Sequence, residues 1–475
     1  PSGPQKLDGK GDMSMWRSTL YLQYVKGDLP FGSQLTLVGR VHHEARTNYL
    51  DKLDNSVTQP GNMMNNYNNN GEAIREAYLD VPFSDRVRLR FGKQQVVWGE
   101  TDLLQALDLV NPRDLSWRSL FEPEDEEWRK PLIMANLIID VPEANGSLQL
   151  LYRPGWDKDT QMGNTLDLWG GRWSAQGSYG VNTLALIPYN YHHKDGDTDD
   201  PSYGFRWTGV ADDLGYSVAY YHTLSDNPVL NLSVPGVVSP YKGSIGAGAG
   251  VLGTLGPGGP VINGEFILPQ INIIGGSLNY PLTGIDMVLR SELAVTLNKP
   301  YNADSILGSA LPTIKEKNTA KIMIGFDKPW RGGKAIFGTV DSPFWTVQIF
   351  DSWIPGFDKK DGLLDVGASH LKEHSVIAVT TFGLSYNQNT VNPSVALAWD
   401  TSYGGGVVIP SVNILYGDHW RLRFDAPVFF KAGGGCSVTP GLNGIAPGTR
   451  GADCTHLFGT FDHNDQLTAR LTYQF

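Results

Sequence analysis

The last ten residues of the chain, 466–475, alternate between polar and apolar side chains. Successive side chains of an extended strand point to opposite faces, so this segment has one polar face, which includes Arg470, and one apolar face. The apolar face carries Leu467, Ala469, Leu471, Tyr473 and Phe475. Such a strand suits the wall of a transmembrane barrel, whose outer face meets lipid and whose inner face meets water.

The same alternation, with arginines on the polar face, recurs along the chain. Segments 87–91 and 420–424 each place two arginines opposite three large apolar residues, and segment 287–297 has a related pattern. In a barrel these charges would line a wet lumen, whereas an unpaired charge in lipid costs several kcal/mol. We therefore predict an inward, lumen-lining position for Arg88, Arg90, Arg290, Glu292, Arg421, Arg423 and Arg470. The alternative is a large soluble β-protein such as a propeller or a sandwich.

Composition excludes two other classes of protein. Hydrophobic residues make up 41% of the chain, and no run approaches the roughly 18–20 apolar residues that a membrane helix needs. The net charge of −11 argues against a nucleic-acid binder, which needs a basic face. The chain begins Pro1-Ser-Gly-Pro without a secretion signal, which we interpret as a processed or trimmed form.

Short turns and long connections alternate along the chain, as expected of a barrel with short periplasmic turns and long extracellular loops. The segments with strand character are 16–26, 34–47, 73–82, 86–98, 132–141, 147–154, 202–211, 215–223, 271–280, 285–297, 318–328, 334–350, 373–386, 391–402, 406–416, 419–430 and 466–475. These are seventeen segments, whereas a bacterial single-chain barrel has an even number of strands. We therefore predict a wall of about eighteen strands, with sixteen as the next choice. A first strand would then precede Pro1 or lie within residues 1–15.

The two cysteines, Cys436 and Cys454, lie in one connection, residues 431–465, which is rich in Gly and Pro. We predict that a disulfide closes this extracellular loop, which implies an oxidising compartment. The alternative is a pair of free thiols. The cysteines have no His or Cys neighbours at ligand spacing, so the sequence predicts no metal site and no cofactor.

The connection 99–131 is unusually apolar and aromatic for a solvated loop, and Leu103, Leu104, Leu107 and Val110 have helical spacing. We predict that it folds inward with a short helix, packs on the lumen wall and narrows the pore. The alternative is a loop cap with a small core of its own. Charged and polar candidates at the constriction are Glu100, Asp102, Asp108, Asn111, Arg113, Asp114 and Arg118.

Segments 91–102 and 107–115 resemble the signature of a proteobacterial outer-membrane family catalogued as domain of unknown function 1302. Segments 203–207 and 321–329 are similar in the same order, so the resemblance covers most of the chain. It implies a barrel in the outer membrane of a Gram-negative bacterium, in contact with lipid and lipopolysaccharide. It also implies a periplasmic lipid-carrier lipoprotein and an exporter as partners, and the passage of greasy molecules. Members of the family tend to be longer at the N-terminus.

Two further loops have a chemical interpretation and a simpler alternative. The Gly-rich residues 243–268 could offer a greasy surface to a ligand, although such a segment is more often a flexible cap. Residues 192–200 carry carboxylates at alternate positions, as calcium loops do, but Arg206 stands where the later Glu would fall. A solvated acidic loop is the preferred interpretation.

The chain lacks GxSxG, HExxH, P-loop and paired CxxC motifs, so we predict that it is not an enzyme. We predict a single barrel domain, residues 1–475, that passes hydrophobic or amphiphilic small molecules such as sterols or lipids. The first alternative is a general diffusion porin for small polar solutes. The second is a barrel that displays its loops to an extracellular protein. The sequence leaves the substrate, the direction of passage and the oligomeric state open.

Overall fold

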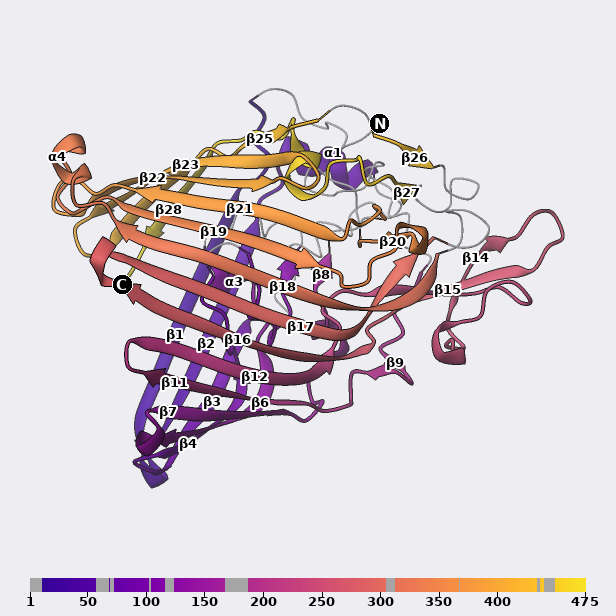
Figure 1. The fold of residues 1–475 in the computed structure, drawn as a ribbon, viewed down its shortest axis with the longest axis horizontal. Coiled ribbons are helices and arrows are strands. Elements are labelled where there is room, and N and C mark those ends of the chain that lie inside the picture. Colours follow the sequence, from indigo (N-terminus) through magenta and orange to yellow (C-terminus); the bar gives the residue numbers. More distant parts are fainter. Residues whose placement is uncertain are drawn as a thin grey trace.

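A computed structural model describes residues 11–56, 68, 72–101, 104–115, 124–166, 187–304, 312–366, 368–433, 436–439 and 449–475. Nineteen strands of these segments form one large sheet that curves into a wall (Figure 1). Two of the nineteen are minor: β20 (Leu363–Leu364) pairs with one end of β17, and β25 (Val428–Lys431) continues the line of β24 along β23. The remaining seventeen strands are the wall itself.

The wall strands pair antiparallel in chain order, each with the next. They are β1 (Arg17–Leu29), β2 (Ser33–Glu44), β3 (Ile74–Ser84), β4 (Val87–Gln94), β6 (Leu132–Val141), β7 (Gly146–Arg153), β11 (Ser202–Ala211), β12 (Leu214–Leu224), β16 (Gln270–Leu282), β17 (Met287–Ala303), β18 (Thr313–Pro329), β19 (Phe344–Trp353), β21 (His374–Gly383), β22 (Val391–Asp400), β23 (Gly405–Tyr416), β24 (Trp420–Asp425) and β28 (Thr468–Tyr473).

This arrangement confirms the predicted all-β antiparallel barrel wall. Each predicted strand segment corresponds to one wall strand, and the seventeen described strands compare with a predicted total of about eighteen. In the described part of the chain, β1 pairs only with β2 and β28 only with β24, whereas the other wall strands have two neighbours. Because neighbours alternate in direction, β1 and β28 run the same way.

Several strand bounds differ from the predicted ones, most of all in the strand predicted for residues 334–350. The predicted strand 334–350 begins only at Phe344, and the residues before it form the helix α4 (Gly333–Phe337). Gly338 ends this helix with a left-handed conformation, φ 63°, which an L-residue adopts only at a cost. The glycines around α4 therefore favour a short helix in a segment whose alternating apolar residues had predicted a strand.

The alternation of side chains across the wall follows the sequence pattern. Arg423 pairs with Arg470 across β24 and β28, and the next pair, Leu422 with Leu471, points to the other face. The outward set is largely exposed although it is apolar, as a lipid-facing surface requires. It includes Leu20, Leu22, Tyr24, Val218, Ile274, Leu278, Leu293, Ile324, Ile349, Trp399, Leu471 and Tyr473.

Tight turns connect the strands at one end of the wall, on the left in Figure 1, and we call this the short-turn end. Eight connections of the described chain lie there. They are residues 30–32, 85–86, 142–145, 212–213, 283–286, 330–343, 384–390 and 417–419. Asn145, Asp212 and Asp286 adopt positive φ in these turns, which short polar side chains tolerate.

Long connections leave the opposite end and carry small elements of their own. A three-stranded sheet of β13 (Val229–Ser233), β15 (Val261–Ile267) and β14 (Gly250–Thr254) encloses a core that includes Leu232 and Ile262. Residues 243–268 are therefore partly a packed hairpin, and the prediction of a flexible cap was wrong for that part. The two-stranded pairs are β5 (Asp114–Leu115) with β8 (Thr165–Leu166), β9 (His192–His193) with β10 (Gly196–Asp197), and β26 (Val438–Thr439) with β27 (Thr449–Arg450).

The disulfide Cys436–Cys454 is present, with Cα atoms 4.5 Å apart, which confirms the predicted pairing. The helices α1 (Asn48–Ser56) and α3 (Asp125–Trp128) also belong to long connections. None of the helices in the described residues is both long enough and apolar enough to cross a membrane.

If the outer face meets lipid, a charge there should be far more damaging than the same charge on the inner face. We expect Ile324→Arg, on the outer face of β18, to lower the free energy of unfolding in lipid vesicles by about 2–4 kcal/mol if it lies near the bilayer midplane. Thr472→Arg, on the inner face of β28, is the matched control and should change it by less than about 1 kcal/mol. Urea titration of both variants measures the difference, and equal losses would contradict the assignment of the two faces.

Candidate functional site

The segment that follows β4 crosses the inside of the barrel and is tied to the wall strand β17. Glu292 of β17 accepts hydrogen bonds from the backbone N–H of Leu107, at 2.9 Å, and from that of Glu100. Arg290 donates to the carbonyl oxygen of Glu100 at 2.5 Å, and Asn279 lies 3.4 Å from its carboxylate. The structure thus brings together Glu100, Arg290 and Glu292, three of the predicted site residues.

Apolar packing holds the same segment against the inner face of a neighbouring sector of the wall. Val96, Trp98, Leu107 and Val110 pack on inward-facing side chains of β6, β7, β12, β16 and β17. The wall residues are Leu132, Met134, Leu151, Ala219, Tyr221, Ile271, Ile273 and Ala294. Trp98 donates to Gln149 at 2.8 Å and meets the ring of Tyr221 edge-on, with centroids 5.5 Å apart. This part of the inner wall is therefore apolar and covered.

A buried ion cluster stabilises the turn of the segment. Asp108 accepts from both Arg113 and Arg129, and Asp125 of α3 pairs with the same two arginines. Three of these side chains are at least nine-tenths buried, with exposures of 3% for Arg113, 8% for Arg129 and 5% for Asp108. Removal of one partner from a buried pair leaves an uncompensated charge, so the cluster is sensitive to single substitutions. Asp108 and Arg113 were predicted as site residues from the sequence, whereas Asp125 and Arg129 were not.

Other predicted site residues hold the segment in shape. Asn111 accepts from the N–H of Val96 at 2.8 Å and donates to the carbonyl of Lys130 at 2.9 Å. Asp114 lies in β5 and pairs with Thr165 of β8. Lys130 donates to the carbonyl oxygens of Thr160 and Gly163 and to the hydroxyl of Thr165, at 2.8–3.0 Å. Burial lowers the pKa of Lys130 to about 8.

The helix α3 makes contact with the opposite side of the wall. Arg40 of β2 donates to the carbonyl of Glu127 at 3.1 Å, and Arg75 of β3 donates to that of Arg129 at 2.9 Å. Arg470 of β28 lies 3.4 Å from the Glu127 carboxylate. Residues 94–101, 104–115 and 124–131 therefore touch both β17 and the β1–β3 and β28 sector. We call these residues the inner segment.

The described inner segment differs from the prediction in one respect. Residues 104–110 form bends, and the short helix is α3, further along the chain. The apolar spacing reflects packing on two sides rather than one helical face, because Leu104 packs against the apolar cluster that includes α1, whereas Leu107 and Val110 pack beside Trp98 on the wall. Leu103 and the site candidates Asp102 and Arg118 lie outside the described residues.

The remaining predicted arginines lie on the inner face between these contacts and the short-turn end. Arg90 pairs with Asp80 at 2.9 Å, and Arg423 pairs with Asp425 at 3.0 Å. Arg88 and Arg421 are exposed. Together with Arg470 these five arginines form what we call the arginine strip, on β4, β24 and β28. Each lies on the inward face, because its neighbours in sequence belong to the outward apolar set.

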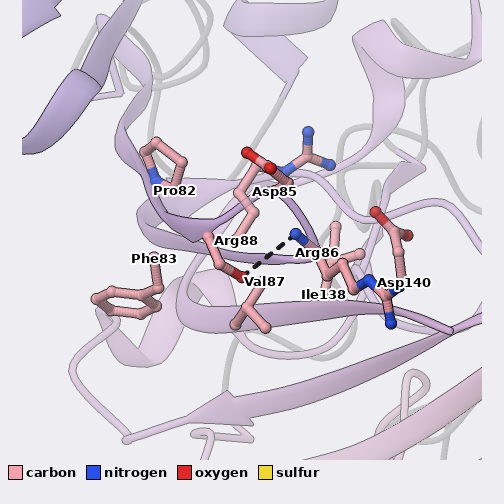
Figure 2. A pocket seen from close by; sticks show the side chains of 9 residues that line it. Pro82, Phe83, Asp85, Arg86, Val87, Arg88, Ile138 and Asp140 are labelled. Atoms are coloured by element: carbon pink, nitrogen blue, oxygen red, sulfur yellow. Dashed lines mark hydrogen bonds between the residues drawn. The ribbon is translucent and has the colours of Figure 1, made fainter.

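A cavity of about 490 Å³ lies at the short-turn end beside the arginine strip. Figure 2 shows Arg86, Arg88, Ile138 and Asp140 around it, and the hydrogen bond from the Arg86 N–H to the Ser84 hydroxyl, 3.3 Å, that shapes the turn between β3 and β4. Charged and apolar groups thus face the same space.

A second pair of segments fills the inside of the barrel, and sequence analysis missed both. Tyr49 and Leu50 of α1 and Phe458 and Phe461 of the 3-10 helix Leu457–Phe461 form one apolar cluster with the inner face of the wall. The wall residues are Met323, Phe350, Val379, Ala398, Val407 and Phe429. The signal was available, because these loops carry large apolar residues just as 99–131 does.

The loop 192–200 brings His192, Asp197 and Asp199 within reach of one another on the surface. His192 Nδ1 lies 2.9 Å from Asp197, and this hydrogen bond raises the pKa of His192. The hairpin β9–β10 explains the grouping, because it places the two ends of the loop side by side.

Loss of one charge from the buried cluster should loosen the inner segment. We expect Asp108→Asn to destabilise it by about 3–5 kcal/mol, because Arg113 and Arg129 lose their shared buried partner. Hydrogen exchange of residues 94–131 measures this local stability. Glu143→Gln, which breaks the exposed pair with Arg86, is the control and should leave the exchange of that segment unchanged. Slow exchange in both variants would show that the cluster is dispensable.

The lowered pKa of Lys130 predicts a pH dependence. The unfolded chain, with an ordinary lysine pKa of 10.5, binds more protons than the folded protein above about pH 8, so stability should rise between these values. The slope from this residue should be at most about 1.4 kcal/mol per pH unit. The contribution of Lys130 is the difference in unfolding free energy between the wild type and Lys130→Met, measured from pH 7 to 10.5. A difference that does not change with pH would contradict the assignment.

Comparison with solved structures finds outer-membrane proteins of low similarity. OmpF of Salmonella typhi, in a complex with daunomycin, matches with 9% identity and a TM-score of 0.40, over 100% of this chain and 94% of that chain. OccAB1 of Acinetobacter baumannii matches with 9% identity and a TM-score of 0.38, over 88% and 90%. An anion-selective porin from Comamonas acidovorans matches with 9% identity and a TM-score of 0.32, over 96% and 98%.

No curated protein matches significantly. A family profile described as "Protein of unknown function (DUF1302)" matches residues 39–475. This span includes the wall strands from β3 to β28 and the whole inner segment. The chain therefore belongs to the DUF1302 family, as its sequence motifs predicted.

Proposed function

We propose that the protein is an outer-membrane channel that passes hydrophobic or amphiphilic small molecules, with the inner segment as its constriction. The observation that carries the proposal is the apolar character of the inner wall. A pore for polar solutes needs an inner face that water wets, whereas inward-facing Leu132, Ile273, Met323 and Phe350 belong to apolar clusters. The inner segment, α1 and residues 457–461 cover this surface in the closed arrangement.

Movement of a covering segment would uncover an apolar path along the wall. The inner segment is fixed to β17 through two side chains, Glu292 and Arg290, and through packing of Leu107 and its neighbours. The packing contacts of Leu107 exchange for contacts with an apolar ligand at little cost, since both bury apolar surface. The hydrogen bonds of Glu292 and Arg290 need water or a polar group of the ligand in exchange. A hydrophobic molecule therefore fits the space that the segment occupies.

The arginine strip forms a polar part of the inner wall, in addition to the apolar path. An amphiphile with an anionic group can keep its apolar part against the covered wall and its charge near Arg88 or Arg421, both of which are exposed. Arginine is suited to carboxylate, sulfate and phosphate groups because its donors form a planar fork. Amphiphilic anions such as sulfated sterols are therefore the preferred class of ligand.

A general porin for small polar solutes is the rival function. The cavity at the short-turn end and the charged pairs Arg90–Asp80 and Arg423–Asp425 are features of a wet interior. The two functions differ in whether the inner segment must move. The carrier lipoprotein and exporter that the resemblance implies, and the display of loops to a surface partner, stay predictions.

A reversible cross-link between the inner segment and the wall tests the proposal. Leu107 and Ala294 of β17 belong to one buried cluster, and a Cβ atom at Gly275 would lie near both, 2.5 Å from Leu107 Cδ1 and 3.3 Å from Ala294 Cα. The pair Leu107→Cys and Ala294→Cys therefore brings two thiols together without adding a Cβ atom against the backbone, as a substitution of Gly275 would. We expect the oxidised double variant in lipid vesicles to pass a sulfated sterol at least about tenfold more slowly than the same protein after reduction. A disaccharide should pass slowly in both states.

The two single variants are the controls, because reduction also opens the native disulfide Cys436–Cys454 in each of them. A disaccharide flux that exceeds the sterol flux and is the same in the oxidised and the reduced protein would favour the porin. Equal flux of both compounds through vesicles with and without the protein would defeat both transport functions.

A further inference from the structure

One connection at the short-turn end is longer than a hairpin needs and is firmly attached to the rim. Residues 330–343, which include α4, join β18 to β19. The N–H of Trp330 donates to the carbonyl of Pro343 at 2.7 Å and closes the connection. The N–H of Val340 donates to Ser385 at 2.9 Å, and the hydroxyl of Tyr386 to the carbonyl of Phe337 at 3.1 Å. This connection, which we call the α4 rim, therefore has a fixed orientation.

The α4 rim exposes an unusual amount of apolar surface for a turn outside the wall. Ile336 is 68% exposed, and Trp330, Phe337 and Val340 are each about two-fifths exposed. Large apolar patches on a protein surface mark contact with a membrane or with another protein. Figure 1 shows α4 at the extreme of the short-turn end, beyond the strands that it connects.

This surface continues the lipid-facing side of the wall. The ring of Phe337 lies 5.7 Å from that of Phe382, and Trp330 lies 6.4 Å from the same ring. Phe382 pairs with Trp345 across β21 and β19, and both point outward, because the alternate residues Thr346 and Thr381 point inward. Trp and Tyr are enriched where a membrane meets water. The rim thus begins where the outer apolar band ends.

The charges of the α4 rim suit a phosphate-bearing surface. Lys334 is exposed, and Arg331 is largely exposed while paired with Asp286 at 2.6 Å. Asp341 accepts from Asn389 at 2.7 Å. Residues 330–343 therefore carry two cations and one carboxylate. Basic residues beside exposed apolar ones are the composition of segments that lie in the headgroup region of a bilayer.

Exposed apolar residues also occur at other turns of the same end. They are Phe31 and Ile285 in two turns, and Phe83 and Tyr416 at the ends of β3 and β23 beside two further turns. A protein partner would favour a patch in one sector, whereas a bilayer surrounds the whole wall. The distribution around the rim therefore favours lipid as the occupant.

We propose that the α4 rim is a membrane-surface anchor that inserts Ile336 and Phe337 into the phospholipid leaflet at the short-turn end and places Lys334 among the phosphate groups. The anchor fixes how deeply the wall sits at this end. It does not depend on what the lumen passes.

Site-directed spin labelling tests the anchor in the full chain. Both native cysteines are in a disulfide, so a single introduced cysteine is the free thiol that takes the label. Ile336→Cys is compared with Gln388→Cys, an exposed polar position in the neighbouring turn. Both proteins are refolded into vesicles of phosphatidylcholine with phosphatidylglycerol. Collision rates of the labels with oxygen, which prefers lipid, and with a water-soluble nickel chelate are then measured.

We expect the ratio of oxygen to nickel accessibility to be several-fold higher at position 336 than at position 388. Equal ratios would place the α4 rim in water and overturn the proposal, including the case in which it faces a protein partner. Val340→Cys is a second labelled site if the first variant does not fold, and it should give a ratio between the other two. The shift of folded barrels on an unheated gel confirms folding before each measurement.

Discussion

The pairing of backbone groups in hydrocarbon is the constraint on which this structure depends. Lipid offers no hydrogen-bond partners, so each N–H and C=O of the wall must find one on a neighbouring strand. Among the described strands, the ladder from β1 to β28 meets this need for the fifteen that have a neighbour on both sides, and side chains alternate between the two faces of the wall. The segments inside the barrel pack against the inner face of this hydrogen-bonded wall.

The inside of the wall is organised in two ways. One part is apolar and covered, by the inner segment over β6 to β17 and by α1 and residues 457–461 over β18 to β25. The other part is charged and lies around β4, β24 and β28, with the arginine strip and the carboxylates Asp80 and Asp425. The buried cluster of Asp108, Arg113 and Arg129 stabilises the turn of the inner segment. A lumen with two chemically different sides suits a molecule that has two such sides itself.

Sequence patterns predicted the features that depend on residues close together in the chain. The strands, their faces, the turns and the disulfide each depend on local alternation, on Gly, Asn, Asp and Pro, or on two cysteines in one loop. Patterns failed where several segments meet. Glu292 lies on the inner face of β17, but no sequence feature indicated its partners, which are backbone groups of residues 100 and 107, about 190 positions away along the chain. A contact between residues so far apart in the chain leaves no local sequence pattern.

The sequence by itself determined that the chain forms an antiparallel wall with lipid on one side, because alternation with a period of two residues has one structural solution when both faces must be satisfied. It also indicated that residues 99–131 would not remain in solvent. Only the tertiary structure decided where that segment lies, which arginines find carboxylates and which stay exposed, and that α1 and residues 457–461 join it inside. Those outcomes depend on contacts between segments that are distant in sequence, and such contacts form only when the folded wall brings these segments together.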